Sequence, residues 1–540
     1  MEGREKFDVA IIGGGISGLY CALNLMNDPR TADRGIKNIV LLESSDRFGG
    51  RFDSDSAKAN FRFAYNDRKS GEKSSMPLLS QLLKDLGMQE DIVKDAASAA
   101  ENTVTYFGGH HVTDLDVKLN PTVWKDLFNL SENEEIRALD DVDDVILMKL
   151  LDHNREKLED KYQQCQDPDF WTFFRNELTW PIGSQEIPLK DLPVSTLLAA
   201  MNFSPGFGSL VEKRASSKDV GSYLQHQMTV KMLTSERYQL KNGWPSIINK
   251  IEKQLLDLDG SNGIKINLRR NCRVNSLLFV KDTDEPINVD LADPGDSTGN
   301  SMISANHVVI AVPPPVAEKI SLGLGDAENA DPECDAIRKM CSNVTGEEMT
   351  FIDLYFKSDW WNKADQKMTG SSYSDLPSSL IQPFYSTCVK NACGGCENCS
   401  EDPSPVGLTI TSGNRNTQFW SSLQRIGNPY NLCAIKDPNL TPTSEAVVDV
   451  ALEQLKVIFR CSNPPRPVMA TYRTLNMDSK YGCYSYFWNV GVNTSDIECA
   501  NPIPGRKLFF CHDAWSDFQG WAEGSLRSTK NVLEKMLAKQ

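Results

Sequence analysis

The sequence predicts an α/β fold that begins with a Rossmann-like nucleotide-binding unit, and three features near its start support this. Phe7 to Ile12 is an apolar run of the length of a buried strand, and Ile16 to Met26 has the apolar spacing of a helix packed on a sheet. A glycine-rich turn joins the two. A second strand is expected from Asn38 to Leu42, directly before the acid Glu43. This order of elements is typical of a parallel sheet with crossover helices.

The glycine-rich turn and the acid after the second strand indicate a dinucleotide site. Glycines allow a tight turn and a close approach to a diphosphate, which the free N–H groups and dipole of a helix N-terminus can hold. Glu43 stands twenty-five positions after Gly18, where a carboxylate can accept hydrogen bonds from ribose hydroxyls. The turn residues expected to contact the cofactor are Gly13, Gly15, Ile16, Ser17 and Gly18.

Gly49, Gly50 and Arg51 follow the ribose acid and distinguish between dinucleotides. A glycine pair with an arginine at this place resembles the pattern of a large flavin family that contains amine oxidases, L-amino-acid oxidases and carotenoid desaturases. In that family the arginine lies near the diphosphate, which suits its charged, bidentate guanidinium. The resemblance implies that the cofactor is FAD and that Gly50 and Arg51 contact it.

The segment from Leu508 to Ser525 has the order of an apolar strand, an acid, a loop and a helix that opens with small residues. It resembles the ending of the flavin amine oxidases. It is most similar to L-amino-acid oxidases of the marine, snail and bacterial type, which carry a similar Ser-Asp-x-Gln-Gly-Trp-x-Glu-Gly run. The resemblance implies that Asp513 lies near the ribityl chain and that Trp521 covers the substrate face of the flavin. Gly520 and Ala522 are also expected to contact the cofactor.

A chain of 540 residues exceeds what one hydrophobic core usually holds, so several lobes are expected. The resemblance implies a Rossmann-like FAD-binding domain, a helical subdomain and a discontinuous mixed-sheet substrate domain. The expected boundaries are 1–75, 236–325 and 465–540 for the FAD-binding domain, 76–235 for the helical part and 326–464 for the sheet-containing part of the substrate domain.

The second segment of the FAD-binding domain is expected to contain three strands. Apolar runs predict them at Ile264–Leu268, Cys272–Val280 and His307–Val312, and the last ends at three consecutive prolines, which should stop any regular element. This order resembles the return of the flavin family to its nucleotide domain. It implies that Arg273 and Val274 lie by the adenine end of the cofactor.

Two places are candidates for holding the substrate. Residues 60–63 sit where the related oxidases have Gly-Gly-Met-Arg, and the resemblance implies that Arg62 grips a substrate carboxylate. Because both glycines are missing here, a surface arginine without a ligand remains an alternative. The aromatic cluster at 481–488 is expected to face the flavin opposite Trp521, with Tyr484 framing the substrate, and simple core packing is its alternative.

Cys483 lies inside this aromatic cluster. The Gly-Cys-Tyr run at 482–484 resembles the stretch of monoamine oxidases whose cysteine bonds covalently to the flavin. The more similar L-amino-acid oxidases bind FAD non-covalently. Non-covalent binding is therefore the favoured interpretation, and a covalent bond is the alternative.

Two positions depart from the family pattern. Flavin amine oxidases usually carry, on a substrate-lobe strand, a lysine that holds a water near the flavin. Here that strand is expected at Met349–Phe356, and the lysine position falls on Thr350 or Phe351. His512 replaces a usual glycine beside the flavin acid. It can transfer protons near neutral pH or hydrogen-bond the flavin, or it is a buried core histidine.

Four cysteines lie close together in a glycine- and asparagine-rich loop, at Cys388, Cys393, Cys396 and Cys399. Their spacing is close to that of iron–sulfur ligands and is compatible with zinc. Outside any recognisable ferredoxin or zinc-ribbon context, local disulfides or free thiols are favoured, and a metal is the alternative. No metal ligand is therefore assigned.

Composition limits the partners. A net charge of −16 argues against nucleic acid and anionic membrane surfaces, which need a basic face, and no apolar run is long enough to cross a bilayer. The expected partner is a small molecule, carrying a carboxylate if Arg62 acts as implied, and a homodimer and a monomer both stay open. Because the first strand is expected at about residue 7, we expect a soluble cytoplasmic protein, or a secreted one if a leader was trimmed.

The resemblance implies an FAD-dependent oxidoreductase of the L-amino-acid oxidase kind. Hydride leaves the Cα–H of an L-amino acid or related amine, the imine hydrolyses to a keto acid and ammonia, and oxygen reoxidises the flavin with release of hydrogen peroxide. The candidate catalytic residues are Trp521, Tyr484, His512 and Arg62. The alternative is a flavin-dependent isomerase of polyunsaturated fatty acids, which the missing lysine and the aromatic lining would suit.

Overall fold

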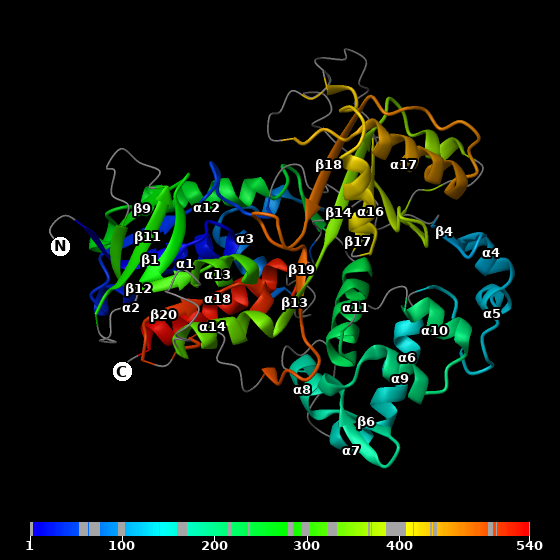
Figure 1. The fold of residues 1–540 in the computed structure, drawn as a ribbon, viewed down its shortest axis with the longest axis horizontal. Coiled ribbons are helices and arrows are strands. Elements are labelled where there is room, and N and C mark those ends of the chain that lie inside the picture. Colours follow the sequence, from blue (N-terminus) through cyan, green and yellow to red (C-terminus); the bar gives the residue numbers. More distant parts are fainter. Residues whose placement is uncertain are drawn as a thin grey trace.

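The computed structural model describes most of the chain in three parts: two sheets and a group of helices (Figure 1). The described residues are 4–52, 63, 76–94, 103–134, 136–139, 141–158, 170–212, 218–235, 238–278, 285–293, 302–321, 332–364, 368, 370–384, 407–413, 415–432, 435, 440–494, 501–503 and 505–538. Arg62 and the four clustered cysteines at 388–399 lie outside them, so the predictions on these residues remain predictions.

A seven-stranded mixed sheet forms the first part, and its centre is parallel. The parallel strands are β1 (Glu5–Ile12), β2 (Asn38–Leu42), β9 (Lys265–Arg269), β12 (Met302–Ile310) and β20 (Leu508–Phe510). β10 (Arg273–Leu278) and β11 (Ile287–Asp293) form an antiparallel ribbon that joins the sheet at β12. Strands from three distant segments of the sequence thus build one sheet, and the predicted α/β class is confirmed.

Alternate residues of the central strands belong to two different cores. Ile11 and Leu41 pack in the core that contains α1 (Ile16–Asn27), α12 (Pro245–Leu258) and α18 (Ala522–Leu537). Ile12 and Leu42 pack in the core that contains α13 (Pro314–Ser321) and α14 (Pro332–Ser342). Because a strand has a period of two and helices cover both faces, the apolar runs of β1 and β2 are continuous rather than alternating.

The prolines after β12 correct one expectation. The strand ends before them, at Ile310, but α13 begins at Pro314, the second of the three. Proline suits the first position of a helix because its φ is already helical and the N–H that it lacks would have no partner there. The expectation that these prolines stop any regular element is therefore right for the strand and wrong for the helix.

The second seven-stranded sheet has the order β18–β14–β17–β16–β15–β4–β5. Its strands are β4 (Val104–Phe107), β5 (His110–Thr113), β14 (Met349–Tyr355), β15 (Ser372–Ser374), β16 (Leu380–Phe384), β17 (Gly407–Gly413) and β18 (Met469–Leu475). α16 (Arg415–Gln424) and α17 (Glu445–Ile458) contribute to its core. β18 belongs to this sheet although it lies in the range 465–540 expected for the FAD-binding domain, and β4 and β5 come from the range expected to be helical.

Helices from residues 114–235 form the third part, around a core of their own. They are α4 (Asp114–Leu119), α5 (Val123–Phe128), α6 (Asp141–His153), α7 (Arg155–Leu158), α8 (Phe170–Glu177), α9 (Val194–Ala200), α10 (Pro205–Glu212) and α11 (Val220–Ser235), beside a hairpin of β6 (Thr179–Ile182) and β7 (Gln185–Pro188). In Figure 1 they lie below the second sheet and beside the nucleotide sheet.

Several shorter elements complete the described structure. They are α2 (Pro29–Asp33), α3 (Pro77–Asp85), the pair β3 (Ile92–Lys94) and β8 (Tyr238–Leu240), and the pair β13 (Val344–Glu347) and β19 (Ser485–Trp488). Within the described ranges, no helix has both the length and the apolar character needed to span a bilayer.

Candidate cofactor and substrate site

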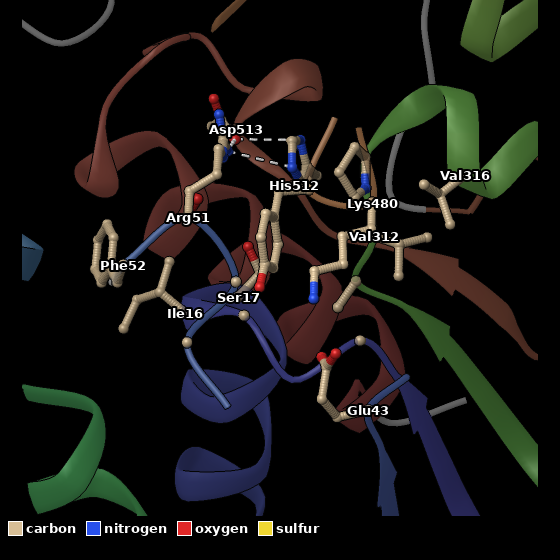
Figure 2. Close-up of a pocket in the computed structure, with 18 of the residues that line it drawn as sticks. Ile16, Ser17, Glu43, Arg51, Phe52, Val312, Val316, Lys480, His512 and Asp513 are labelled. Atoms are coloured by element: carbon tan, nitrogen blue, oxygen red, sulfur yellow. Dashed lines mark hydrogen bonds and ion pairs between the residues drawn. The ribbon is translucent and has the colours of Figure 1, made fainter. Parts of the chain in front are cut away.

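A cavity of about 520 Å³ opens at the carboxyl ends of β1 and β2 and extends to the loop that follows β18 (Figure 2). The predicted cofactor residues that line it are Gly13, Gly15, Ile16, Ser17, Glu43, Gly50, Arg51, Arg273, Val274, Asp513, Gly520, Trp521 and Ala522. Of the predicted catalytic residues, Tyr484, His512 and Trp521 line it. Gly18, also predicted to contact the cofactor, does not line the cavity and lies inside the turn.

The glycine turn is shaped by close backbone contacts. Gly13 has a φ of +105°, and a Cβ there would lie 2.6 Å from the carbonyl oxygen of Ala311. A Cβ on Gly18 would lie 2.0 Å from the carbonyl oxygen of Gly13, so this glycine lets α1 pack against the turn. Gly15 differs, because a Cβ there would have no protein atom within 4 Å. It borders open cavity, which fits a group bound against the turn.

The N-termini of two helices meet at this cavity. No side chain caps α1 at Gly15 or α18 at Trp521, and both of these residues line the cavity. The helices pack on each other in one core, and the Thr529 hydroxyl of α18 donates to the Ser17 carbonyl at 3.4 Å. Uncapped N–H groups and aligned helix dipoles suit a diphosphate, so these residues fit a dinucleotide.

Glu43 is buried at the edge of the cavity and holds the turn in place. Its Oε2 accepts from the Gly14 N–H at 2.8 Å, and its Oε1 accepts from the N–H and the hydroxyl of Ser45 at 2.8 and 2.7 Å. A carboxylate has further lone pairs, so these contacts leave it able to accept from a ribose. The predicted ribose contact remains a prediction, to which the structure adds a role in positioning the turn.

Arg51 and Asp513 form an ion pair in the cavity wall, in which Asp513 is buried and Arg51 is partly buried (Figure 2). Burial favours the neutral form of Asp513, but the charge and hydrogen bond of Arg51, together with His512 and the Gly520 N–H, outweigh it and hold the pKa of this carboxyl below its usual value. Burial likewise opposes the charge of Arg51, and Asp513 nevertheless raises the pKa of its guanidinium. Both groups therefore stay charged next to the place where the flavin is expected.

His512 lies beside this pair and is neutral. Burial lowers the pKa of its imidazole to about 4, against the opposing effect of the Asp513 charge. Its Nε2 lies 3.3 Å from Nη2 of Arg51, and its Nδ1 lies 3.1 Å from Oδ1 of Asp513 and 3.1 Å from the backbone nitrogen of Ala514. Both ring nitrogens thus have polar neighbours within the protein, and the pKa favours the neutral ring at pH 7. The structure therefore favours the interpretation of His512 as a buried, hydrogen-bonded histidine.

The two positions where the family lysine was expected, Thr350 and Phe351, do not themselves line the cavity. Phe351 of β14 is buried and packs against the Tyr484 ring, with centroids 5.7 Å apart at 60°. Thr350, the neighbouring strand residue, instead contacts the Thr474 hydroxyl at 3.1 Å. Burial raises the pKa of Tyr484 to about 12, so its phenol keeps its proton. Tyr484 therefore offers an aromatic surface and a neutral hydroxyl.

Cys483 is directed away from the cavity. It is fully buried, its thiol lies against Gly346 of β13, and it does not line the cavity as Tyr481 and Tyr484 do. Burial raises the pKa of this thiol to about 11, which disfavours the thiolate. These features support non-covalent binding of FAD.

Some residues of the cavity were not predicted from the sequence. Phe52, Phe63 and Trp244 line it, and the Trp244 ring lies 4.5 Å from the Phe52 ring and 5.6 Å from the Phe63 ring. Lys480 also lines it, one residue before the aromatic cluster (Figure 2). No motif marks these positions, because only the tertiary fold brings them to the cavity. Elsewhere in the described residues, no group of three metal-ligating side chains occurs.

Comparison with known proteins assigns the family. A sequence model of the flavin-containing amine oxidoreductases matches residues 16–532. The chain belongs to this family. As a flavin-containing amine oxidoreductase it binds FAD. The cavity, whose lining fits a dinucleotide, agrees with this assignment. No curated protein matches the chain by sequence comparison.

Solved structures show the same fold. A double mutant of putrescine oxidase superposes with a TM-score of 0.60 at 13% identity, covering 99% of this chain and 100% of that chain. Cyclohexylamine oxidase from Brevibacterium oxydans superposes with a TM-score of 0.61 at 14% identity, covering 98% of each chain. At such identities the likeness concerns the fold, and the substrate has to be argued from the cavity of this chain.

Proposed function

We propose that this flavin-dependent amine oxidoreductase oxidises an L-amino acid or a related amine that carries a carboxylate. The proposal rests mainly on the composition of one cavity, which joins a nucleotide-binding wall to an aromatic and cationic wall. Bound FAD would accept hydride from the substrate Cα–H and pass the electrons to oxygen, giving hydrogen peroxide. The resulting imine would hydrolyse to a keto acid and ammonia.

Tyr484 and Trp521 would frame the reacting carbon. Both line the cavity, and Tyr484 is supported from behind by Phe351. Rigid aromatic walls exclude water and restrict the orientations of a small amine. Their low polarity also favours the uncharged amine over the ammonium, and only the uncharged amine has the lone pair that assists loss of hydride.

Arg62 stays in the proposal as one carboxylate anchor. It lies outside the described residues, but its neighbour Phe63 is buried, lines the cavity and pairs with Tyr238 through two backbone hydrogen bonds of 3.1 Å. The backbone next to Arg62 is therefore tied to the cavity wall. Neither the family nor the structural neighbours favour the fatty-acid isomerase that the sequence left open, and it is not proposed.

Anaerobic reduction of the bound flavin tests this proposal. The purified holoenzyme is mixed without oxygen with the twenty L-amino acids and with carboxylate-free amines that include putrescine and cyclohexylamine. We expect loss of oxidised-flavin absorbance with at least one amino acid, and peroxide and ammonia when oxygen is admitted. Reduction by the carboxylate-free amines together with none by any amino acid would overturn it.

A further inference from the structure

A loop that follows the second sheet forms part of the cofactor cavity. The chain leaves β18 at Leu475, and residues 478–481 then line the same cavity as the glycine turn after β1. We call residues 478–481 the Lys480 loop. The cavity is therefore bounded by the nucleotide sheet and by a segment that belongs to the other sheet.

Arg47 ties the Lys480 loop to the glycine turn. Its Nη2 donates to the Tyr481 hydroxyl at 3.0 Å and to the Gly50 carbonyl at 3.0 Å. Gly50 lies against the turn, because a Cβ added to it would be 3.4 Å from Cα of Gly15. Two hydrogen bonds from one guanidinium thus hold the loop close to the turn against which the diphosphate is expected.

Lys480 extends toward the same turn. Figure 2 shows its side chain reaching into the cavity next to Val312. Val312 borders the turn, since a Cβ added to Gly13 would lie 2.6 Å from its Cγ1. On the loop side, Nζ of Lys480 lies 4.9 Å from the centroid of the Tyr481 ring. Val312 and Tyr481 together place the ammonium beside the glycine turn.

The charge of Lys480 is not balanced by a neighbouring acid. Within the described part of the chain, its side chain forms no ion pair, and Asp478 of the same loop is exposed and does not pair with it. Arg51, which the sequence led us to expect near the diphosphate, is already paired with Asp513. Lys480 is therefore a cation of the cavity lining that can pair with a bound anion.

We propose that Lys480 binds the diphosphate of FAD, so that the Lys480 loop clasps the cofactor against the glycine turn. The inference concerns the cofactor and does not depend on which substrate is oxidised. The ammonium would form charge-assisted hydrogen bonds with phosphate oxygens, and the bond from Arg47 to Tyr481 would keep the loop in place. FAD should then be held by residues of both sheets.

Titration of apoprotein with FAD, followed by flavin fluorescence, tests the contact without any substrate. We expect Kd to rise about tenfold or more in Lys480→Met and to recover in Lys480→Arg, as loss of a charged hydrogen bond predicts. The control Lys456→Met, which removes a solvent-accessible lysine paired with Glu453 on α17, should change Kd less than twofold. Because Lys480 is exposed, the melting temperature of the Lys480→Met apoprotein should equal that of wild type. A Kd within twofold of wild type in Lys480→Met would overturn the proposal.

The acid of the same loop distinguishes a charge contact from a simple cover. Asp478 also lines the cavity, so Asp478→Asn removes a negative charge near the expected diphosphate. We expect FAD to bind this variant as tightly as wild type or more tightly, because repulsion is removed. If Asp478→Asn and Lys480→Met weakened FAD binding equally, the loop would act only as a cover, and the proposal would be wrong.

Tyr481→Phe tests the clasp itself. The variant keeps the ring and loses the hydroxyl that accepts from Arg47. We expect the rate of FAD dissociation, measured by dilution of the holoenzyme into a flavin-scavenging apoprotein, to rise roughly fivefold, as loss of one hydrogen bond predicts. An unchanged dissociation rate would show that this bond does not hold the loop over the cofactor, and it would overturn the clasp.

Discussion

Arg51 and Asp513 stand 462 residues apart in the sequence and form one ion pair in the cavity wall. The two motifs that identify the flavin site are therefore one physical unit, since the buried carboxylate of Asp513 needs the charge of Arg51 beside it. The pair also makes hydrogen bonds to the backbone of two neighbouring segments. Nη1 of Arg51 donates to the Tyr484 carbonyl at 2.7 Å, and the Gly520 N–H donates to Oδ2 of Asp513 at 3.3 Å. The aromatic wall is thus tied to the nucleotide wall.

Removing Arg51 should damage both folding and flavin binding. We expect Arg51→Met to lower the free energy of unfolding of the apoprotein by roughly 3–5 kcal/mol, because Asp513 is left buried with an uncompensated charge. Arg51→Lys should lower stability and flavin binding less than Arg51→Met does. Lysine keeps the positive charge but lacks the forked guanidinium group. Denaturant unfolding and the ratio of flavin to protein absorbance measure the two effects.

The control for Arg51 is an exposed ion pair. Arg155 pairs with Asp152 at 3.1 Å, with both side chains mostly in solvent, so Arg155→Met should cost less than about 1 kcal/mol and leave the flavin content unchanged. If the Arg51→Met apoprotein were as stable as wild type, the buried pair would not have the structural role assigned to it.

Two glycines of the turn should respond differently to the same substitution. Gly15 has a φ of −72° and no protein atom near an added Cβ, so Gly15→Ala should leave the apoprotein within about 1 kcal/mol of wild type. Its methyl group would occupy the space against which the diphosphate is expected, so FAD should bind at least tenfold more weakly. Calorimetric titration of apoprotein with FAD measures this change.

Gly18→Ala is the matched comparison. The added Cβ would lie 2.0 Å from the Gly13 carbonyl oxygen, so the variant should unfold at a lower temperature even without FAD. Normal flavin affinity in Gly15→Ala would place the diphosphate elsewhere than at the turn. An unchanged melting temperature in Gly18→Ala would contradict the close contact between helix and turn.

The sequence predicted the strands of the nucleotide sheet well because each strand is marked by a run of neighbouring apolar residues. Continuous apolar runs predict β1 and β2 within two residues, since both faces of these strands are covered, and β2 agrees at both ends. Pro314 shows the limit of such rules. The chemistry that ends a strand at a proline also allows a helix to begin there, and only packing of α13 against the sheet decides between them.

The sequence predicted the cavity residues that belong to motifs. It missed the residues that only the tertiary fold brings to the cavity. Gly15, Glu43 and Asp513 occupy positions that particular chemistry requires, so their spacing was informative. Lys480 and Trp244 reach the same cavity through loops whose course depends on how β18 and α12 pack, and no local pattern records that. His512 was ambiguous for a related reason, because its charge state depends on burial.

The charge state of His512 leads to a pH prediction for stability. Its pKa in the folded protein is about 4 and its ordinary value is 6.5. Because the folded pKa is depressed, the full stability is present above pH 6.5 and is lost as the pH falls, since the unfolded chain binds the proton first. At pH 5 this loss should be roughly 2 kcal/mol relative to pH 7.5.

His512→Asn isolates this contribution. Unfolding free energies of the wild-type and variant apoproteins are measured by denaturant titration at pH 7.5 and pH 5, and the variant should lose roughly 2 kcal/mol less on acidification. His226, whose pKa burial also lowers, is present in both proteins and cancels in the difference. Equal pH dependence in the two proteins would show that His512 is not held neutral by burial.

Cys483 should carry no flavin. Its thiol is buried against Gly346, is protonated because its pKa is about 11, and does not line the cavity. The holoenzyme denatured in acid should therefore release all its FAD, and intact-mass spectrometry should show the polypeptide alone. Cys483→Ser should bind FAD in the same ratio to protein as wild type, whereas loss of covalent flavin mass in this variant would refute the prediction. Gly346→Ala tests the packing itself, because its Cβ would lie 2.4 Å from the thiol sulfur and should lower the melting temperature.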